Sequence, residues 1–285
     1  MGKSTKDQRD HFYRRGKQEG YRARSAYKLI QLDDQYGVLG CEADAPARAA
    51  GDSRAALAAA FGPALGADVY ARLQGANRHP GAVVDLCAAP GSWSQVLSRT
   101  LSQSGTRIVA VDLQAMAPLA GVTQIVGDIT TETTARAVER ALADDGDDPA
   151  ARRHADLVVC DGAPDVTGVP LLDEYVQSQL LMAAVELAMR MLRRDGVFIA
   201  KVFAQPGSAS ARVLLAQLRR QFAHVELAKP PSSRAASAEH FVVCLGFLDA
   251  AHATRRVHAE FLGDLRGYQA AGGAPMLGAA AASQT

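Results

Sequence analysis

Four aspartates each follow a short apolar run, and their carboxylates could hold a ligand by accepting hydrogen bonds: Asp85, Asp112, Asp128 and Asp161. The carboxyl ends of parallel strands meet at one edge of a sheet, and open α/β sheets bind ligands at that edge. Asp112 is suitably placed there to bind ribose hydroxyls, and Asp128 to accept from an adenine amino group. One aspartate at a strand end is more often a turn or cap residue, but four in succession indicate a shared site.

A turn of small residues, 87–91 (CAAPG), follows the first of these runs. Between a buried strand and a helix, such a turn lets a ligand approach the backbone closely beside a helix N-terminus. The turn does not match GxGxxG, so a dinucleotide pyrophosphate is a weak interpretation. No phosphate-binding lysine follows it either, which excludes a P-loop.

Lys201 lies inside the apolar segment GVFIAKVF, where a lysine is out of place unless it points into a site. Charged groups are rarely buried without a partner. The alternative is an edge-strand lysine whose ammonium reaches outward to water. Glu239 stands just before the last apolar run, and Lys28 lies in a predicted helix, RSAYKLIQL. By itself, Lys28 would be an ordinary solvated helix lysine.

Alternating strands and helices must position these residues. From about residue 80, runs of Val, Ile and Leu alternate with helical segments, and most runs lack a polar face. Such continuous runs are typical of strands buried on both faces. The predicted strands are 82–87, 107–112, 123–127, 156–160, 196–203, 224–228 and 240–247. The predicted helices are 92–103, 132–143, 174–194 and 209–221.

This alternation predicts an α/β fold with right-handed crossovers and a mainly parallel sheet. The loop between 224–228 and 240–247 has no room for a crossover helix, so we expect these two strands to pair antiparallel. The helix at 174–194 carries the clearest end signals. Asp173 is its predicted N-cap, and its last turn is basic and followed by Gly196.

A chain of 285 residues with 48% apolar residues can bury one large core. We expect a single domain over 1–249, followed by a C-terminal extension over 250–285 whose end is disordered. The Ala- and Gly-rich residues 40–80 predict a surface insertion, and 144–154 predict a polar surface loop.

Positive charge is concentrated near the N-terminus. Residues 1–30 contain nine basic and three acidic residues, whereas the whole chain has a formal net charge of +1. Lys and Arg displace counterions from phosphates, so a basic arm on a near-neutral body suits a polyanionic partner. The other interpretation is a solvated tail, and charge alone does not separate the two.

The cysteines form no CxxC pair and show no metal-binding spacing, so we expect no metal site. They are Cys41, Cys87, Cys160 and Cys244. No apolar run reaches the roughly 18 residues that span a membrane, and the N-terminus has no apolar signal segment. We therefore expect no membrane partner and a reduced, soluble, cytoplasmic protein.

Several segments together resemble a known family. DLCAAPGSWSQ, DGAPD, the lysine of IAKVF and the glutamate of SSRAASAEHF resemble the FtsJ-like RNA ribose 2′-O-methyltransferases. The opening MGKSTKDQRDHFYRRGKQEGYRARSAYKLIQLDDQYGVL is similar to the eukaryotic tRNA methyltransferases that modify anticodon-loop positions 32 and 34. The resemblance covers about 1–39, 81–140 and 155–247, and 259–269 weakly.

The resemblance implies a Rossmann-like class I methyltransferase fold, with a seven-stranded, mostly parallel sheet and an antiparallel last strand. It also implies S-adenosyl-L-methionine (SAM) as cofactor, contacted by Gly91, Trp93, Asp112, Asp128 and Asp161. The family's four catalytic positions fall on Lys28, Asp161, Lys201 and Glu239, and none is replaced. Ser92 stands where many relatives carry a second glycine; because serine is small, we expect binding to survive.

The implied reaction is methyl transfer to a ribose 2′-OH, a poor nucleophile that must lose its proton. A general base beside that oxygen contributes about 10²–10⁴-fold, and Lys201 is the expected proton acceptor. A free lysine, with a pKa of about 10.4, is charged at pH 7, so a base role needs a site that favours the neutral amine. The opposite hypothesis is equally open: a charged Lys201 stabilises a developing alkoxide. Asp161 and Glu239 are expected to orient the amines.

We expect RNA to bind the basic arm and Arg234, because arginine can hold a phosphate with two hydrogen bonds. Tyr13 and Tyr21 lie among these charges, and they either stack on bases or pack in the core. The resemblance also implies tRNA as partner, together with separate non-catalytic auxiliary subunits that choose the nucleotide.

Three alternatives stand beside this interpretation. A methyltransferase of ribosomal RNA or of the mRNA cap would share every catalytic residue, but the tRNA-type N-terminus argues against it. A non-catalytic RNA-binding scaffold would keep the fold, but the intact catalytic positions argue against it. A nicotinamide-dependent dehydrogenase is disfavoured by the absence of GxGxxG.

Overall fold

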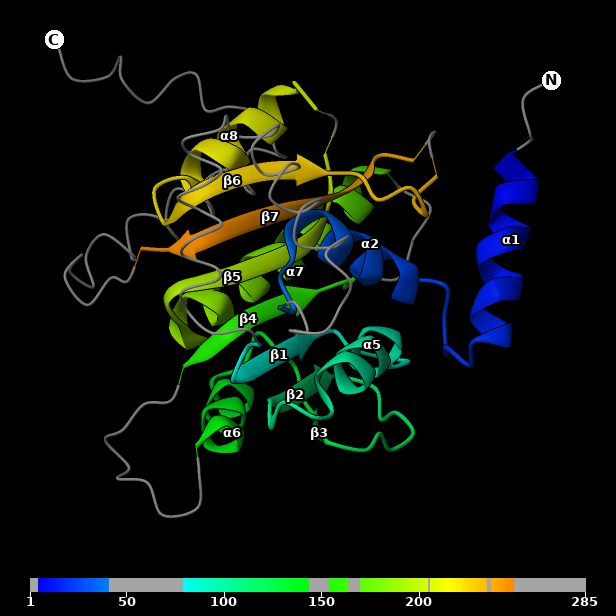
Figure 1. Ribbon diagram of the computed structural model, residues 1–285. Helices are drawn as coiled ribbons and strands as arrows, with labels where there is room; N and C mark the ends of the chain where they lie inside the picture. The colour runs from blue at the N-terminus through cyan, green and yellow to red at the C-terminus, as the bar shows by residue number, and fades with distance from the viewer. Residues whose placement is uncertain are drawn as a thin grey trace, which may run out of the picture.

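One seven-stranded sheet forms the centre of the computed structural model, which describes residues 5–40, 79–143, 154–163, 170–204, 206–234 and 237–248 (Figure 1). The strands are β1 (Ala82–Leu86), β2 (Arg107–Asp112), β3 (Val122–Val126), β4 (Ala155–Cys160), β5 (Leu192–Phe203), β6 (Phe222–Ala228) and β7 (Glu239–Phe247). Their order is β3-β2-β1-β4-β5-β7-β6. The first five pair parallel, and β7 pairs antiparallel with both β5 and β6. The predicted fold class and the predicted antiparallel pairing are therefore confirmed.

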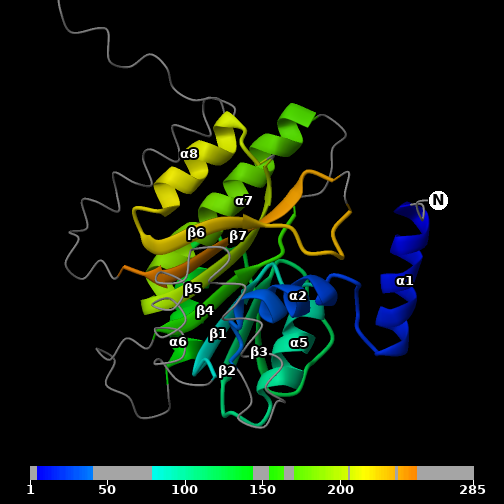
Figure 2. The ribbon, with the colours of Figure 1, turned by 45° about the horizontal axis from the view of Figure 1, so that its top comes forward.

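Helices cover both faces of the sheet and make three layers (Figure 2). Five of the described helices pack against the sheet: α2 (Ala26–Tyr36), α5 (Ser92–Leu101), α6 (Glu132–Leu142), α7 (Pro170–Met191) and α8 (Ala209–Leu218). A sixth described helix, α1 (Thr5–Gln18), does not. On one face α6, α7 and α8 bury a core that includes Leu86 and Phe198. On the other face α2 and α5 bury a core that includes Leu29 and Ile199. Strand β1 is buried along its whole length, but β3, at the edge of the sheet, is not.

Local signals explain several helix ends. The side chains of Thr131 and Ser208 cap α6 and α8 by accepting hydrogen bonds from backbone N–H groups in the first turn. Helix α2 ends at Gly37, which has a left-handed φ of 63° and donates its N–H to the Asp33 carbonyl at 2.7 Å.

The predicted ends of the helix at 174–194 are wrong. Helix α7 begins at Pro170 instead of following an Asp173 cap, because proline fits the first helical turn, where its missing N–H is not needed. At the other end, the Arg193 guanidinium pairs with Asp156 of β4. Leu192 is already in register with Ala155. Arg193 and Arg194 therefore belong to β5, and the basic residue in the last turn of α7 is Arg190.

The N-terminal arm forms a helix that the sequence did not predict. Helix α1 stands apart from the sheet, beyond the edge where the parallel strands end (Figures 1 and 2). Among the described residues, Tyr27 of α2 receives α1: the ring of Phe12 lies 5.3 Å from that of Tyr27, and the Arg15 guanidinium lies 5.2 Å from the centre of the same ring. This contact ties the basic arm to the helix that carries Lys28.

Several predicted segments lie outside the described residues. They are most of the 40–80 insertion, all but the last residue of the 144–154 loop, and the C-terminal extension. The two flanks of the insertion meet, since His79 Nδ1 lies 3.0 Å from the Leu39 carbonyl oxygen. Within the described part of the chain, no helix combines the length and the apolar character needed to cross a bilayer.

Candidate active site

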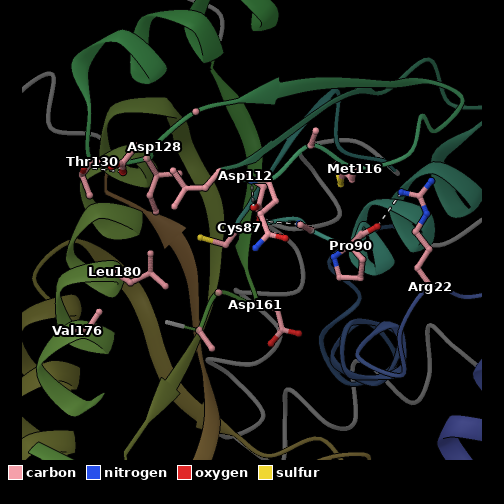
Figure 3. A pocket seen from close by; sticks show the side chains of 18 of the residues that line it. Arg22, Cys87, Pro90, Asp112, Met116, Asp128, Thr130, Asp161, Val176 and Leu180 are labelled. Carbon is pink, nitrogen blue, oxygen red and sulfur yellow. Dashed lines mark hydrogen bonds between the residues drawn. The ribbon is translucent and has the colours of Figure 1, made fainter. Parts of the chain in front are cut away.

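A pocket of about 870 Å³ opens at the carboxyl ends of the parallel strands (Figure 3). Asp112, Asp128 and Asp161 all line it. Leu180 of α7 lies on one side, and Pro90 lies on the other (Figure 3). An apolar cleft of roughly 300–1,000 Å³ with a few convergent polar groups is the usual form of a cofactor site.

Backbone hydrogen bonds hold two of these carboxylates in place. Asp112 accepts from the N–H of Ala89 at 2.9 Å and from the N–H of Gln114 at 2.8 Å. Asp128 Oδ1 accepts from the backbone N–H and the hydroxyl of Thr130, each at 2.8 Å. No described residue donates to Asp128 Oδ2. Because a carboxylate can accept about four hydrogen bonds, both groups keep acceptors for the hydroxyl or amino groups of a ligand.

Asp85 has a different role from the other three aspartates. It is 1% exposed, does not line the pocket, and accepts from the Ser94 hydroxyl at 2.6 Å. Burial raises the pKa of Asp85 to about 7, and the nearby carboxylates of Asp161 and Asp112 add to the effect. Asp85 therefore joins α5 to β1. Three of the four predicted aspartates line the pocket, and their role in binding a ligand stays a prediction.

Gly91 and Trp93 are not among the residues that line the pocket. Gly91 precedes α5 with a left-handed φ of 99°, which favours glycine, and a Cβ there would lie 2.5 Å from Arg22 Nη1. The Trp93 side chain is 2% exposed, stacks on Phe241 at 5.7 Å, and donates its indole N–H to the Ser25 carbonyl at 2.9 Å. Only backbone contacts with a cofactor fit this placement, and the binding role of both residues stays a prediction.

The four predicted catalytic residues lie together as a lysine–carboxylate cluster of Lys28, Asp161, Lys201 and Glu239. Lys28 Nζ donates to Glu239 Oε2 at 2.9 Å and to Asp161 Oδ1 at 3.3 Å. Lys201 Nζ donates to the Asp161 carbonyl at 2.6 Å and lies 3.3 Å from Asp161 Oδ1. Each lysine is 8% exposed. Asp161 thus joins the two amines, and it also lines the pocket.

The register of β5 and β7 assembles this cluster. Strand β5 lies inside the sheet between β4 and β7, so the edge-strand alternative for Lys201 is excluded. Lys201 is directly opposite Phe241, and Glu239 lies two residues earlier on the same face. Helix α2 covers that face and brings Lys28 Nζ to 5.5 Å from the centre of the Phe241 ring.

Ser233 is a member of the site that the sequence did not reveal. Its hydroxyl donates to Glu239 Oε1 at 2.7 Å. Burial by itself would raise the pKa of Glu239, but the Lys28 ammonium and the hydrogen bonds from Lys28 and Ser233 outweigh burial and lower it. Glu239 is therefore ionised at neutral pH. A serine in a loop of small polar residues carries no signal until the loop folds.

The predicted RNA-binding residues differ in their surroundings. Tyr13 is 52% exposed. Tyr21 packs edge-on against Tyr27 at 5.8 Å, with the Arg99 guanidinium 4.5 Å from the centre of its ring. For Tyr21 the packing alternative holds, and base stacking stays a prediction for Tyr13. Arg234 is exposed in the loop before β7 and free to face a phosphate.

Known proteins are similar to this chain over most of its length. A mouse protein named tRNA (cytidine(32)/guanosine(34)-2′-O)-methyltransferase is 44% identical over 248 residues, which cover 87% of this chain and 61% of that protein. The Schizosaccharomyces pombe protein of the same name is 43% identical over 256 residues, covering 87% of this chain and 73% of that protein. The chain thus spans about three fifths of the length of its mouse relative.

A solved structure and a family model complete the comparison. A Plasmodium falciparum protein named as a ribosomal RNA methyltransferase aligns with a TM-score of 0.57 and 21% identity, covering 80% of this chain and 100% of that chain. At this identity the likeness establishes the fold alone. The model of the FtsJ-like methyltransferases matches residues 21–247, from the connector before α2 to the end of β7. The chain therefore belongs to the FtsJ-like methyltransferase family.

Proposed function

We propose that the chain is a SAM-dependent methyltransferase that methylates ribose 2′-OH groups of tRNA at anticodon-loop positions 32 and 34. The observation that carries the proposal is the buried lysine–carboxylate cluster, which shares Asp161 with the pocket. The names of the mouse and fission yeast relatives support the tRNA substrate.

The pocket suits SAM by the chemistry of its carboxylates. Asp112 offers acceptors for ribose hydroxyls, and Asp128 Oδ2 offers one for the adenine amino group. When bound, SAM supplies an electrophilic methyl group on a positively charged sulfur. Asp161 belongs to both the pocket and the cluster, which supports methyl transfer at their junction.

In this proposal Lys201 would accept the 2′-OH proton as the ribose oxygen takes the methyl group, with the electron pair of the broken carbon–sulfur bond left on sulfur. A neutral amine has two N–H groups and one lone pair. The Asp161 carbonyl accepts one N–H of Lys201 at 2.6 Å, and Asp161 Oδ1 lies 3.3 Å from the same nitrogen, so the lone pair of a neutral Lys201 stays available for the proton. Lys28 pairs with Glu239 at 2.9 Å and with Asp161 at 3.3 Å, so in this proposal it orients both carboxylates.

The competing role for Lys201, a charged group that stabilises an alkoxide, predicts a different pH dependence. A base must be neutral, so the single-turnover rate of the wild type should rise with pH to a plateau. A wild-type rate that is flat or falling from pH 6 to 9 would instead assign alkoxide stabilisation to Lys201.

The first test is methylation of an unmodified tRNA transcript with tritiated SAM, followed by mapping of the 2′-O-methyl groups. We expect label in the anticodon loop with the wild type and none above background with Lys201→Met, which keeps the length of the side chain. Arg136→Ala is the control, because Arg136 forms only an exposed ion pair with Glu132 on α6. Loss of activity in this control as well would undo the assignment of Lys201.

The substrate and partners are tested in the same experiment. Ribosomal RNA and capped mRNA are incubated in parallel, and label on either with none on tRNA would reject the tRNA proposal. We also propose auxiliary subunits and a cytoplasmic location, as expected from the sequence. Methylation of tRNA that requires added cell extract would support the subunits, and cell fractionation would test the location. SAM binding without methylation of any RNA, even with extract, would favour a non-catalytic scaffold.

A further inference from the structure

Arg22 connects two loops that lie far apart in the sequence but on the same side of the pocket (Figure 3). Its Nη1 donates to the Pro90 carbonyl at 2.9 Å, in the loop after β1. Its Nη2 donates to the carbonyls of Ala117 at 2.8 Å and Pro118 at 3.1 Å, in the loop after β2. Arg22, Pro90 and Ala117 all line the pocket. One side chain thus joins both loops where they border the cavity.

The acceptors of Arg22 are backbone carbonyls, which distinguishes it from an ordinary surface arginine. No carboxylate of the described residues forms an ion pair with it. The planar guanidinium offers five N–H donors in fixed directions, and these three bonds direct it at both loops at once. The ammonium of a lysine is a single point and cannot keep this geometry. The guanidinium also packs closely against the backbone of Gly91, since a Cβ at that position would lie 2.5 Å from Nη1.

The connector that carries Arg22, residues 19–25, is itself anchored on α5. Gln95 accepts from the Arg22 backbone N–H at 2.7 Å and donates to the Gly20 carbonyl at 3.1 Å. Arg99 donates to the carbonyls of Glu19 at 2.9 Å and Gly20 at 3.3 Å. Helix α5 starts directly after the Pro90 loop. The connector anchored on α5 therefore lies beside this loop, and its Arg22 guanidinium reaches both loops.

The same connector leads to the lysine–carboxylate cluster. The hydroxyls of Ser25 and Ser92 lie 2.5 Å apart, and Trp93 donates to the Ser25 carbonyl. Lys28 lies three residues after Ser25 in the sequence. Ser92 thus ties the start of α5 to the segment that carries Lys28.

We propose that Arg22 is a positioning residue for the cofactor site, which holds the Pro90 and Ala117–Pro118 loops at the spacing that SAM requires. The inference rests on the proposed function, since SAM is the ligand it names. This role differs from the phosphate binding expected of the basic N-terminal arm, because three of the five N–H groups of Arg22 already donate to carbonyls of the two loops.

The test compares Arg22→Ala and Arg22→Lys with Arg99→Ala, which loosens the same connector without touching either loop. Calorimetry without RNA gives the Kd for SAM, and steady-state assays give kcat and the KM for tRNA. Arg22→Ala should raise the Kd for SAM about tenfold, as for a lost hydrogen-bonding group. Arg22→Lys should do so by a smaller factor, and Arg99→Ala should stay within twofold of the wild type. At saturating SAM, kcat and the KM for tRNA should change less than twofold in the Arg22 variants.

Hydrogen exchange supplies a second readout that needs no ligand. Amides in 113–121 should exchange faster in Arg22→Lys than in the wild type, and Arg99→Ala should leave them unchanged. A raised KM for tRNA with an unchanged Kd for SAM would move Arg22 to the RNA-binding surface and overturn the proposal. If the wild type binds no SAM, the proposed function fails. Hydrogen exchange would still test whether Arg22 holds the two loops. Unchanged exchange of residues 113–121 in Arg22→Lys would reject that role as well.

Discussion

Two adjacent serines before β7 allow the geometry of the lysine–carboxylate cluster to be tested by one hydroxyl group. Ser233→Ala removes the donor to Glu239 Oε1, 2.7 Å away. A hydrogen bond to a charged group contributes about 1.5–3 kcal/mol, equivalent to about 10- to 150-fold in rate if all of it is lost in the transition state. Glu239 still keeps Lys28 at 2.9 Å, so we expect the lower end of this range, about a tenfold loss of kcat/KM.

Ser232→Ala is the matched control. Ser232 is 5% exposed, and its hydroxyl has no hydrogen-bond partner among the described residues. Its backbone contacts survive the substitution, because the N–H donates to Gln31 Oε1 and the carbonyl accepts from Arg24. We expect kcat/KM to stay within twofold of the wild type, measured with the same tRNA and at saturating SAM.

A pH measurement separates a positioning role from a general loss of packing. The lowered pKa of Glu239 in the folded protein stabilises the fold above its unfolded value of about 4.3. That contribution is lost as the pH falls through the folded pKa. Without the Ser233 hydroxyl the folded pKa rises, so acid unfolding followed by circular dichroism should begin at a higher pH in Ser233→Ala. The positioning role of Ser233 is refuted if kcat/KM of Ser233→Ala stays within twofold of the wild type, or if kcat/KM of Ser232→Ala falls by as much as that of Ser233→Ala.

Three further outcomes are expected from other parts of the site. Asp112→Asn should weaken SAM binding about tenfold in calorimetry, because the amide replaces one of two acceptors and turns a donor toward a backbone N–H; an unchanged Kd would remove Asp112 from the cofactor site. Gly162→Ala should lower the free energy of unfolding in urea by about 1–3 kcal/mol, since its Cβ would lie 2.8 Å from Cys87 Sγ. A urea midpoint equal to that of the wild type would show that the loop shifts to accommodate the Cβ. Burial raises the pKa of Asp85 to about 7, above its unfolded value of about 3.9, so the wild type should lose stability as the pH rises between these values. Asp85→Asn should flatten that slope in thermal unfolding, and an equal slope in both proteins would contradict the assignment.

The sheet was largely predictable because inner strands must be apolar on both faces. The predicted strand 107–112 coincides with β2, and the other predicted strands overlap β1 and β3 to β7. The C-terminal end of α7 was not predictable from end signals, because a tertiary contact overrides them. Arg193, which resembles the basic last turn of a helix, instead pairs with Asp156 across the sheet.

The site was predictable in its residues but not in its contacts. Motif resemblance identified Lys28 and Glu239, yet their ion pair depends on the docking of α2 and on the β5–β7 register. Ser233 and Arg22 left no signal, because their partners are a side chain and three carbonyls that meet them only in the folded chain. Trp93 carried a strong motif signal, but the side chain lies in the core, which sequence alone does not distinguish from a ligand contact.

The ion pair between Lys28 and Glu239 joins residues 211 positions apart, which has a consequence for synthesis of the protein. At about 5–20 residues per second, a ribosome needs roughly 10 to 40 s to reach Glu239 after completing Lys28. During that interval the apolar side of α2 lacks Phe241 and Val243, which complete its core in the folded protein. We expect the nascent N-terminal segment to need protection by chaperones until β7 emerges, which crosslinking of stalled ribosome complexes would detect. Chains truncated before β7 should aggregate, because they lack the strand against which α2 packs.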